Sequence, residues 1–355
     1  VDDDYFAALA AGHPHAVYVN TRVQNCMLAN GEPGFFNSSL ASVGERGDVR
    51  CTNPCGEIAL EEWESCNLGH VNLSGMGMDG PAGVDAMPFV LMARFLVRAT
   101  FVELLDEKQA AVERRNRRVG VGILGFQEWL VQNGVRYSEA AESDSVQWAL
   151  QHYAAAATRA ADRYADSLDI PRPVKHTTVA PTGTVAKLAG VSEGIHPIYS
   201  RYFVRRVRYA EGDAALAELV AQGYETEPCI YNPHTTVVLF HVRDAILDVG
   251  NSHLVEQADE LTVAEKLSVQ ELAQRFYADN AVSYTVNMSE STTPEELFAG
   301  LAEYLPRLKG TTVFPFNSRP QSPYTEITEA EYNAAVDQGV AQGFDDCATG
   351  ACPIR

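Results

Sequence analysis

Cysteines are the residues of this chain that most clearly could do chemistry. Five of its seven cysteines fall into two tight groups: Cys51, Cys55 and Cys66, and then Cys347 and Cys352. An odd cysteine count, in a chain of 355 residues that shows no signal segment, argues against a secreted disulfide scaffold. Thiol redox chemistry and metal binding are therefore the two kinds of chemistry that these groups predict.

The first group allows a zinc site. Cys51, Cys55, Cys66 and His70 follow the spacing Cys-x3-Cys-x10-Cys-x3-His, which offers four candidate ligands for a tetrahedral ion. On this interpretation the chain is a zinc-stabilised binding module and not an enzyme. Nothing in the sequence marks the tight knuckle on which zinc-binding cysteine pairs usually lie.

The neighbours of Cys55 point to catalysis instead. The run Asn53-Pro54-Cys55-Gly56-Glu57 places an amide two residues before the thiol and a carboxylate two residues after it. Alternate side chains of an extended segment point to the same side. We therefore expect Asn53, Cys55 and Glu57 to face one substrate, where a thiol, an acid and an amide suit radical or acid–base chemistry.

Two glycine-containing segments are candidate phosphate sites. The turn Pro181-Thr182-Gly183-Thr184-Val185 lies between a predicted strand and a predicted helix, where free main-chain N–H groups bind phosphate without a positive side chain. An ordinary tight turn is the competing interpretation. Gly120-Val121-Gly122-Ile123-Leu124-Gly125 matches G-x-G-x-x-G, but residues 114–118 before it are a charged run and not the buried strand that a dinucleotide fold requires.

Strands and helices must alternate to position these residues. Apolar, β-branched and capping patterns predict a mainly α/β chain, an α/β barrel or sheet. The predicted strands are 16–19, 176–180, 235–242, 282–286 and 311–314. The predicted helices are 87–114, 126–132 (opened by 120–125), 139–168, 262–277, 294–308 and a last one that a capping box starts at Thr328.

The composition of the chain argues against some classes of binding partner. The chain has 27 Lys and Arg against 47 Asp and Glu, a formal net charge of −20, which argues against gripping a nucleic-acid polymer through its phosphates. Its length predicts about two domains or one large barrel. The most apolar stretch, 87–105, is interrupted by Arg94 and Arg98, so we expect no membrane span and a cytoplasmic protein.

Taken together, the motifs resemble those of ribonucleotide reductases. Asn53-Pro54-Cys55-Gly56-Glu57-Ile58, with Cys66-Asn67-Leu68-Gly69 and Asn72-Leu73 after it, is similar to the finger loop of that family. The similarity continues through 116–122, 180–184, 279–283 and the C-terminal cysteine pair, so that it covers essentially the whole chain. The short interval from Cys55 to Cys66 and the Cys347-x4-Cys352 tail resemble the adenosylcobalamin-dependent class, especially its monomeric triphosphate-reducing branch.

The resemblance implies a fold and a division of the chain. The fold is part of the ten-stranded α/β barrel of ribonucleotide reductases. Residues 1–75 would hold the end of the first half-barrel and the finger loop. Residues 76–340 would form the second half-barrel with the phosphate loop and the cobalamin-facing segments, and 341–355 would be a flexible redox tail.

The resemblance also implies roles for single residues. Cys55 would carry a thiyl radical that abstracts the 3′ hydrogen of a ribonucleoside triphosphate or diphosphate. Glu57 would accept the 3′-OH proton, and Asn53 would hydrogen-bond the substrate hydroxyls. Cys66 would be one of the two thiols that reduce the 2′ position and become a disulfide.

The tail would return that disulfide to its reduced form. Cys347 and Cys352 would do so by thiol exchange and would then be reduced by thioredoxin or a similar dithiol donor. A metal clip or inert thiols are the competing interpretation for this pair, but no other cysteine or histidine lies nearby in sequence.

Adenosylcobalamin would generate the thiyl radical. The resemblance places its contacts in 194–207 and 310–324, which makes His196, Tyr199 and Arg201 candidate cofactor-binding residues. A purely structural role is the competing interpretation for His196. We predict no metal-ion site of the protein's own.

Part of the family pattern has no counterpart in the chain. The second substrate-reducing cysteine should lie well upstream of the finger loop, yet only Cys26 and Cys51 precede Cys55, and neither has a matching context. The first half-barrel and its allosteric nucleotide site are likewise without a counterpart. We therefore expect an N-terminal half, supplied as a separate chain or lost by truncation, to cover the exposed side of the barrel.

Overall fold

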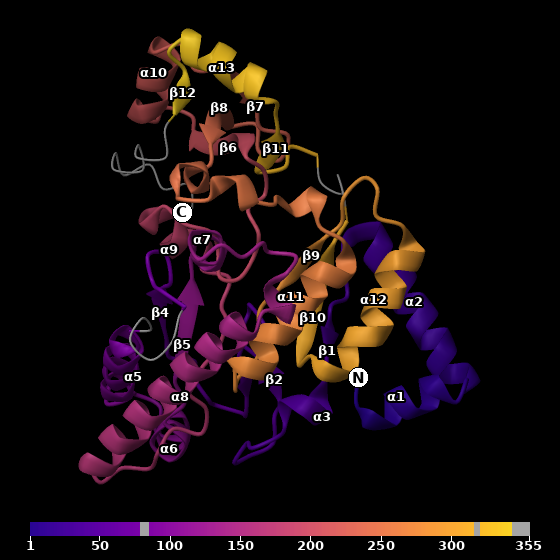
Figure 1. Cartoon of the computed structure of the whole chain (residues 1–355), viewed down its shortest axis with the longest axis vertical. Helices are drawn as coiled ribbons and strands as arrows, with labels where there is room; N and C mark the ends of the chain where they lie inside the picture. Colours follow the sequence, from indigo (N-terminus) through magenta and orange to yellow (C-terminus); the bar gives the residue numbers. More distant parts are fainter. Residues whose placement is uncertain (79–84, 316–319, 343–355) are drawn as a thin grey trace.

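The computed structural model describes residues 1–78, 85–315 and 320–342, so Cys347 and Cys352 lie outside the described residues. Its central feature is a curved sheet of parallel strands (Figure 1). These strands are β4 (Leu68–Asn72), β5 (Gly120–Leu124), β9 (Thr285–Asn287) and β10 (Gly310–Phe314). Between β5 and β9 the segment 177–179 bridges both neighbours in parallel, Val121 to Thr177 and Val179 to Val282.

Helices lie between successive strands in the sequence, as in other parallel sheets. Helices α5 (Met87–Ala99) and α6 (Glu107–Asn116) link β4 to β5, and α7 (Phe126–Gln132) and α8 (Asp144–Ser167) lead to 177–179. After α9 (Gly183–Ala189), α11 (Val263–Phe276) precedes β9, and α12 (Pro294–Tyr304) leads to β10. This order confirms the α/β half-barrel that the motifs predicted.

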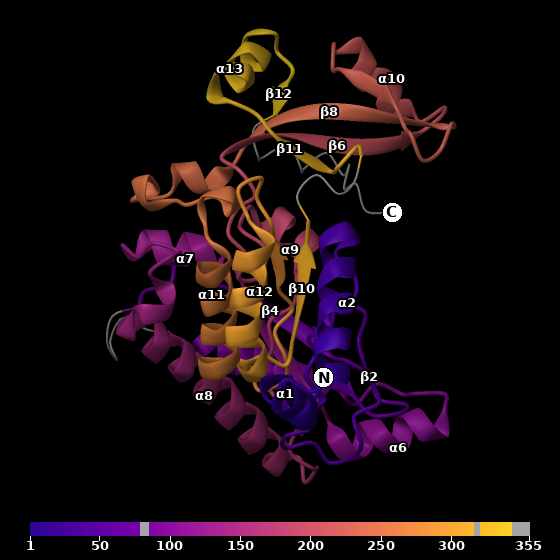
Figure 2. The ribbon, with the colours of Figure 1, turned by 90° about the vertical axis from the view of Figure 1, so that its right-hand side faces the viewer.

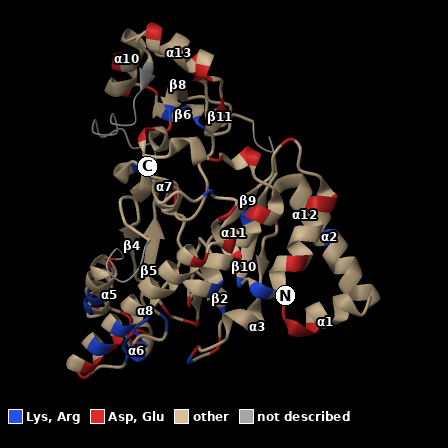
Figure 3. Cartoon of the chain, in the orientation of Figure 1, with Lys and Arg blue, Asp and Glu red and all other residues tan. Residues whose placement is uncertain are grey.

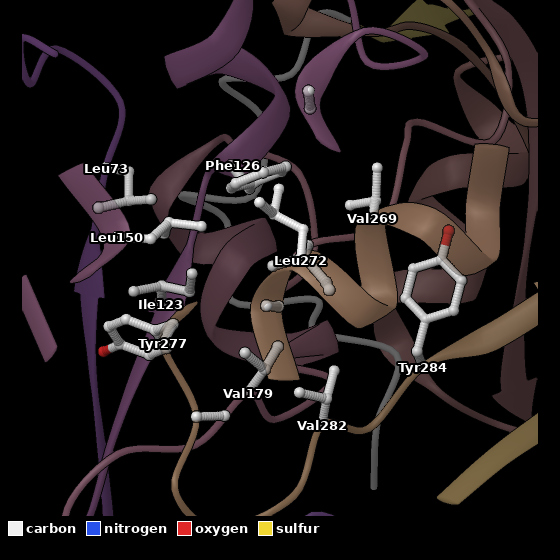
Figure 4. Close-up of a cluster of buried hydrophobic side chains, with 14 of the residues drawn as sticks. Leu73, Ile123, Phe126, Leu150, Val179, Val269, Leu272, Tyr277, Val282 and Tyr284 are labelled. Atoms are coloured by element: carbon white, nitrogen blue, oxygen red, sulfur yellow. The ribbon is translucent and has the colours of Figure 1, made fainter. Parts of the chain in front are cut away.

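The main hydrophobic core lies between the strands and the helices of their outer face. Ile123, Val179 and Val282 come from the strand segments and pack toward Leu150 of α8 and Leu272 of α11 (Figure 4). All five side chains are essentially excluded from solvent. Burial of this aliphatic surface is the main contribution that holds the strand segments in one layer.

The N-terminal part of the chain lies at the β10 edge of the sheet. Here lie α1 (Asp3–Ala10), α2 (Pro14–Asn30) and α3 (Ser38–Ala41), and β1 (Phe35–Phe36) pairs antiparallel with β10. The hairpin of β2 (Cys51–Thr52) and β3 (Ala59–Leu60) follows. Figure 2 shows α2 on one side of β10, and α11 and α12 on the other.

A second, five-stranded sheet lies beyond the carboxyl ends of the barrel strands (Figure 2). Its long strands β6 (Tyr202–Ala210) and β8 (Thr235–Arg243) pair antiparallel along their whole length. Around them lie β7 (Thr226–Pro228), β11 (Tyr324–Glu326), β12 (Ala341–Gln342), α10 (Ala214–Ala221) and α13 (Glu329–Asp337). The sheet has a small core of its own, which includes Phe203, Val238 and Phe240.

Two predicted elements were wrong. Residues 16–19, predicted as a strand, belong to helix α2, because Pro14 at its first turn and Gly31 in the left-handed conformation after its end set a 17-residue helix around them. The single helix predicted over 87–114 is two helices. α5 ends at Ala99, and the Asp106 side chain caps α6 by accepting from the amides of Lys108 and Gln109.

The segment 120–125 was predicted to open helix 126–132, but only Gly125 lies at the start of that helix. Residues 120–124 form the buried strand β5, which pairs in parallel with β4. Its glycines allow the inner face of the sheet to pack closely, since a Cβ on Gly122 would lie 2.4 Å from the His70 ring.

No helix of the described residues is long and apolar enough to span a bilayer. Figure 3 shows Lys and Arg gathered around α5, α6 and α8 of this acidic chain.

Candidate active site

The Asn53–Glu57 segment is a tight loop at the tip of the β2–β3 hairpin. The Gly56 amide donates to the Asn53 carbonyl (3.0 Å), and Gly56 has a φ of +82°, a conformation that favours glycine. The Asn53 side-chain oxygen accepts from the Ile58 amide (3.1 Å). The prediction of an extended loop was therefore wrong, because this turn folds it back. Asn53 and Glu57 are buried, whereas Cys55 is exposed at the tip.

The loop is attached to the inner face of the half-barrel. The Glu57 carbonyl accepts from the Ala281 amide (2.8 Å) and from the Thr178 hydroxyl (3.2 Å). Ile58 is fully buried, and its Cδ1 atom lies 3.5 Å from where a Cβ on Gly120 would be. The small residue at 120 therefore leaves room for the loop to pack on the strands.

The Glu57 carboxyl lies beneath the loop and is only 1% exposed. Its Oε2 atom has no hydrogen-bond partner within the described part of the chain. Burial raises the pKa of Glu57, and a hydrogen bond from the Asn53 side chain partly opposes that rise. A buried carboxylate with a free oxygen is a stronger base than an exposed one, which suits it to accept a proton from a ligand.

Cys55 and Cys66 share one electrostatic environment. Cys66 lies two residues before β4, and both thiols are exposed. Partial burial and the charge of Glu57 raise the pKa of both thiols, and Cys66 raises that of Cys55 further. The Asn53 side chain acts on both Cys66 and Glu57 and lowers the pKa of each, although burial outweighs this effect. The structure thus brings together all four residues that the sequence singled out as catalytic.

The zinc interpretation is wrong. No group of three or more His, Cys, Asp or Glu side chains in the described ranges is arranged to hold a metal ion. Cys51 lies on β2 and is exposed, whereas His70 is on β4 with its ring against the inner face beside Gly122. Burial lowers the pKa of His70, and its Nε2 atom is buried without a described partner.

The turn 181–185 directly precedes and opens helix α9. Thr182 has a φ of +55° and its hydroxyl accepts from the Gly194 amide (2.8 Å), so that this side chain is already engaged. A Cβ added at Gly183 would meet nothing nearer than the Glu193 carboxylate at 3.9 Å, so the space beside this residue is open. The amides at the start of α9, including those of Thr184 and Val185, have no preceding helical turn to bind.

The three residues suggested as cofactor contacts are placed differently from one another. Both ring nitrogens of His196 are occupied: Nδ1 lies 3.2 Å from the Glu193 carbonyl, and Nε2 accepts from the Thr285 amide (3.1 Å). Arg201 forms an ion pair with Glu260 at 2.7 Å. Of the three, Tyr199 is the one that is exposed.

Sequence reasoning missed a buried charge network behind the finger loop. The Arg118 guanidinium is 1% exposed and donates to Glu45, to Glu64 (2.8 Å from Nε) and to Asn280 (3.0 Å). Asn116 donates to Glu64 (2.9 Å) and also to Glu61. The run Asn116-Arg117-Arg118 was visible as a motif, but its partners lie 50 or more positions away in the chain, which no local pattern reveals.

The comparisons with known proteins agree with this geometry. The family model described as "Ribonucleotide reductase, barrel domain" matches residues 21–168 and 172–310. A relative from Mycobacterium phage D29 is 45% identical over 347 residues, and one from Levilactobacillus brevis, named adenosylcobalamin-dependent ribonucleoside-triphosphate reductase, is 34% identical over 375 residues. Both alignments cover 92% of this chain, which spans about half the length of these relatives.

A solved structure agrees with the sequence comparisons. The crystal structure of a B12-dependent (class II) ribonucleotide reductase superposes with a TM-score of 0.76 at 30% identity, covering 95% of this chain and 50% of the other. Because the family match extends over most of the residues and the strand order is that of a half-barrel, the chain belongs to the ribonucleotide reductase barrel-domain family.

Proposed function

We propose that this chain is the catalytic, C-terminal part of an adenosylcobalamin-dependent ribonucleoside-triphosphate reductase. The single observation that carries the proposal is the cluster of Asn53, Cys55, Glu57 and Cys66 on the inner face of the half-barrel. The reaction converts a ribonucleotide and two thiols into a 2′-deoxyribonucleotide, one disulfide and one water. The relatives' names support the triphosphate as substrate.

The environment of the two thiols suits this chemistry. A thiyl radical forms by removal of a hydrogen atom from S–H, so the sulfur must keep its proton at neutral pH. Partial burial and the charge of Glu57 raise the pKa of Cys55 and of Cys66, which keeps both in the thiol form. Cys55 would abstract the 3′ hydrogen, and Cys66 would supply one of the two reducing equivalents.

Glu57 and Asn53 would act on the substrate hydroxyls. The free Oε2 atom of Glu57 would accept the 3′-OH proton, and its raised pKa makes it a better base for that purpose. The Asn53 amide, whose oxygen accepts from the Ile58 amide, would orient the hydroxyls of the sugar. The main-chain N–H groups of residues 182–185, at the start of α9, would bind the phosphates, whereas Pro181 before them has no N–H to donate.

The surface beside α9 is compatible with a large organic cofactor. Val185 and Leu188 on α9 and the nearby Tyr199 are exposed apolar side chains, with Leu188 69% exposed. These residues would hold adenosylcobalamin by apolar contact. When bound, the cofactor supplies a one-electron oxidant by homolysis of its cobalt–carbon bond. His196 contributes no free ring nitrogen, because both are engaged within the chain.

Two further partners are predicted: an N-terminal half of the enzyme and a dithiol reductant. An N-terminal half would provide the second reducing thiol, since Cys26 lies exposed on α2 and away from the finger-loop pair in sequence. Cys347 and Cys352 would pass electrons from thioredoxin or a similar dithiol. The cytoplasmic location inferred from the sequence is also still a prediction.

The test is reduction of a ribonucleoside triphosphate by the complete enzyme, with adenosylcobalamin and dithiothreitol. We expect Cys55→Ser to abolish both product formation and the thiyl signal in electron paramagnetic resonance. Cys51→Ser, an exposed cysteine on the same hairpin, is the matched control and should leave both unchanged. Activity retained by Cys55→Ser would refute the proposal. Full turnover by this chain alone would refute the requirement for an N-terminal half.

A further inference from the structure

Two helices on the outer side of the half-barrel each carry a pair of like-charged arginines. Arg94 and Arg98 lie four positions apart on α5, and Arg159 and Arg163 lie four positions apart on α8. All four are exposed. Residues with this spacing are neighbours on a helix surface, so the two members of each pair repel each other. The chain as a whole has a net charge of −20, yet positive charge gathers around these helices (Figure 3).

These four arginines have no carboxylate partner among the described residues. The carboxylates that follow them on α8 belong to Asp162 and Asp166. Both of these aspartates are engaged by Arg172, at 3.9 and 2.8 Å. The charge of the two arginine pairs is therefore left for an anion from outside the chain.

Three of the four arginines meet at one groove between α5 and α8. The groove has a volume of about 370 Å³ and is lined by Arg94, Arg159 and Arg163. Ala156 and Ala160 of α8 also line it, and their small side chains leave space between the charged groups. A volume of this size lies within the range typical of sites for small molecules.

Arg94 is held in place across the groove. Its Cζ atom lies 4.9 Å from the centroid of the Tyr164 ring, which belongs to the other helix. A guanidinium group that stacks on an aromatic ring in this way keeps the N–H groups at its edge free to donate. Part of the groove is thus organised before any ligand binds.

The groove lies on the opposite side of the strands from the candidate active site. A Cβ on Gly69 of β4 would meet Met92 and Leu96 of α5, so this face of the strand is turned toward the helix. The finger loop packs on the other face, where Ile58 contacts position 120, the partner of residue 68 in the sheet. Successive residues of a strand point to opposite faces, so the two sites are separate.

We propose that the groove between α5 and α8 binds a polyphosphate chain, either inorganic or carried by a nucleotide. Guanidinium groups donate paired hydrogen bonds to phosphate oxygens, and three of them suit the several negative charges of such a chain. This site goes beyond the proposed function, which places the substrate phosphates at the start of α9.

The first experiment measures the protection of single arginines from phenylglyoxal in a phosphate-free buffer, with each modified peptide quantified by mass spectrometry. Inorganic tripolyphosphate, at about ten times its dissociation constant, should slow modification of Arg94, Arg159 and Arg163 about tenfold, because an occupied site does not react. Arg22 on α2 and Arg275 on α11 are also exposed and should react at an unchanged rate. Equal protection of all five, or equal protection by sodium chloride at the same ionic strength, would overturn the proposal.

The second experiment repeats the measurement on a double variant. In Arg159→Gln/Arg163→Gln, protection of Arg94 should require about ten- to hundredfold more tripolyphosphate, since charge-assisted hydrogen bonds are lost. Arg22→Gln/Arg275→Gln removes the same charge elsewhere and should behave as the wild type. Unchanged protection of Arg94 in the first variant would contradict the proposal.

Two further probes identify the source of the ligand. Protection by adenosine triphosphate at the same concentration as tripolyphosphate would show that the phosphate chain alone is recognised, and protection at a lower concentration would show that a nucleotide is preferred. Protection by polyglutamate but not by tripolyphosphate would overturn the proposal in favour of an acidic protein partner. None of these readouts involves nucleotide reduction, so a failure here is distinguishable from a failure of the proposed reductase activity.

Discussion

The main-chain carbonyl of Glu57 accepts a 2.8 Å hydrogen bond from the amide of Ala281, which joins the finger loop to the segment that leads into β9. This bond positions the loop through its backbone and does not use the side chains of Glu57 or Cys55. The Glu57 carboxyl and the Cys55 thiol therefore stay available for a ligand. The position of the loop depends on the strand that receives it.

Thr178→Val tests this attachment. The Thr178 hydroxyl lies 3.2 Å from the Glu57 carbonyl and 3.0 Å from the Ala281 carbonyl, and valine removes it at nearly constant volume. We expect a loss of about 1 kcal/mol in the free energy of unfolding, the usual contribution of one hydrogen bond. Amides of the loop should exchange hydrogen faster, and turnover of the complete enzyme should fall.

Thr312→Val is the control for that variant. The Thr312 hydroxyl also donates to a main-chain carbonyl, that of Tyr284 (3.0 Å), but on β10 and away from the loop. It should lose comparable stability without faster exchange in residues 53–58. Equal exchange in both variants would show that Thr178 does not position the loop.

Gly122→Ala tests why the G-x-G-x-x-G run has glycine. A Cβ at this position would lie 2.4 Å from Cδ2 and 2.8 Å from Nε2 of His70. We expect a loss of about 1–3 kcal/mol in the free energy of unfolding, typical of overpacking. Gly250→Ala, where a Cβ would meet nothing within 4 Å, should change it little.

The double variant with His70→Ala separates a clash from a backbone effect. If the ring is the obstacle, the two substitutions together should cost less than the sum of their separate costs, as measured by urea unfolding. Strict additivity would mean that Gly122 serves another purpose.

His176→Gln tests a buried ion pair directly before the strand segment 177–179. Nδ1 of His176 lies 3.1 Å from Asp279 and Nε2 lies 2.9 Å from Asp162. Burial alone would lower the pKa of His176, but hydrogen bonds and charges from Asp279 and Asp162 outweigh it and raise the pKa above 6.5. A raised pKa contributes stability that is complete below the unfolded value of 6.5 and is lost as pH rises through the folded value.

The wild type should therefore exceed His176→Gln by about 2 kcal/mol in the free energy of unfolding at pH 6, and the gap should narrow toward pH 9. His234→Gln removes an exposed pair with Glu211 and should show a small difference at both pH values. A gap that widens with pH would contradict the raised pKa of His176.

The tail cysteines can be tested by the choice of reductant. In the complete enzyme, Cys347→Ser and Cys352→Ser should stop turnover with thioredoxin, because the shuttle is cut, yet retain it with dithiothreitol, which reaches the active-site disulfide directly. Rates measured with both reductants on the same preparation decide the point. Equal loss with both would show that these thiols do not act as a shuttle.

The sequence by itself identified the residues that the candidate site brings together. Asn53, Cys55, Glu57 and Cys66 all lie within 14 residues of chain. Helices α11, α12 and α13 begin within one residue of their predicted starts, because capping and turn preferences act over short distances. Local pattern was misleading where tertiary packing overrides it. Residues 16–19 have the apolar, β-branched character of a strand but lie in a long helix, and 120–125 has the glycines of a loop but forms a central strand.

Only the tertiary structure decided which distant groups meet the finger loop. Ala281 and Thr178 bind its backbone, and Arg118 joins Glu45, Glu64 and Asn280 behind it. These partners come together because parallel strands from separate parts of the chain lie side by side in one sheet. Contacts of that kind depend on strand order and register, and neither is encoded in the spacing of neighbouring residues.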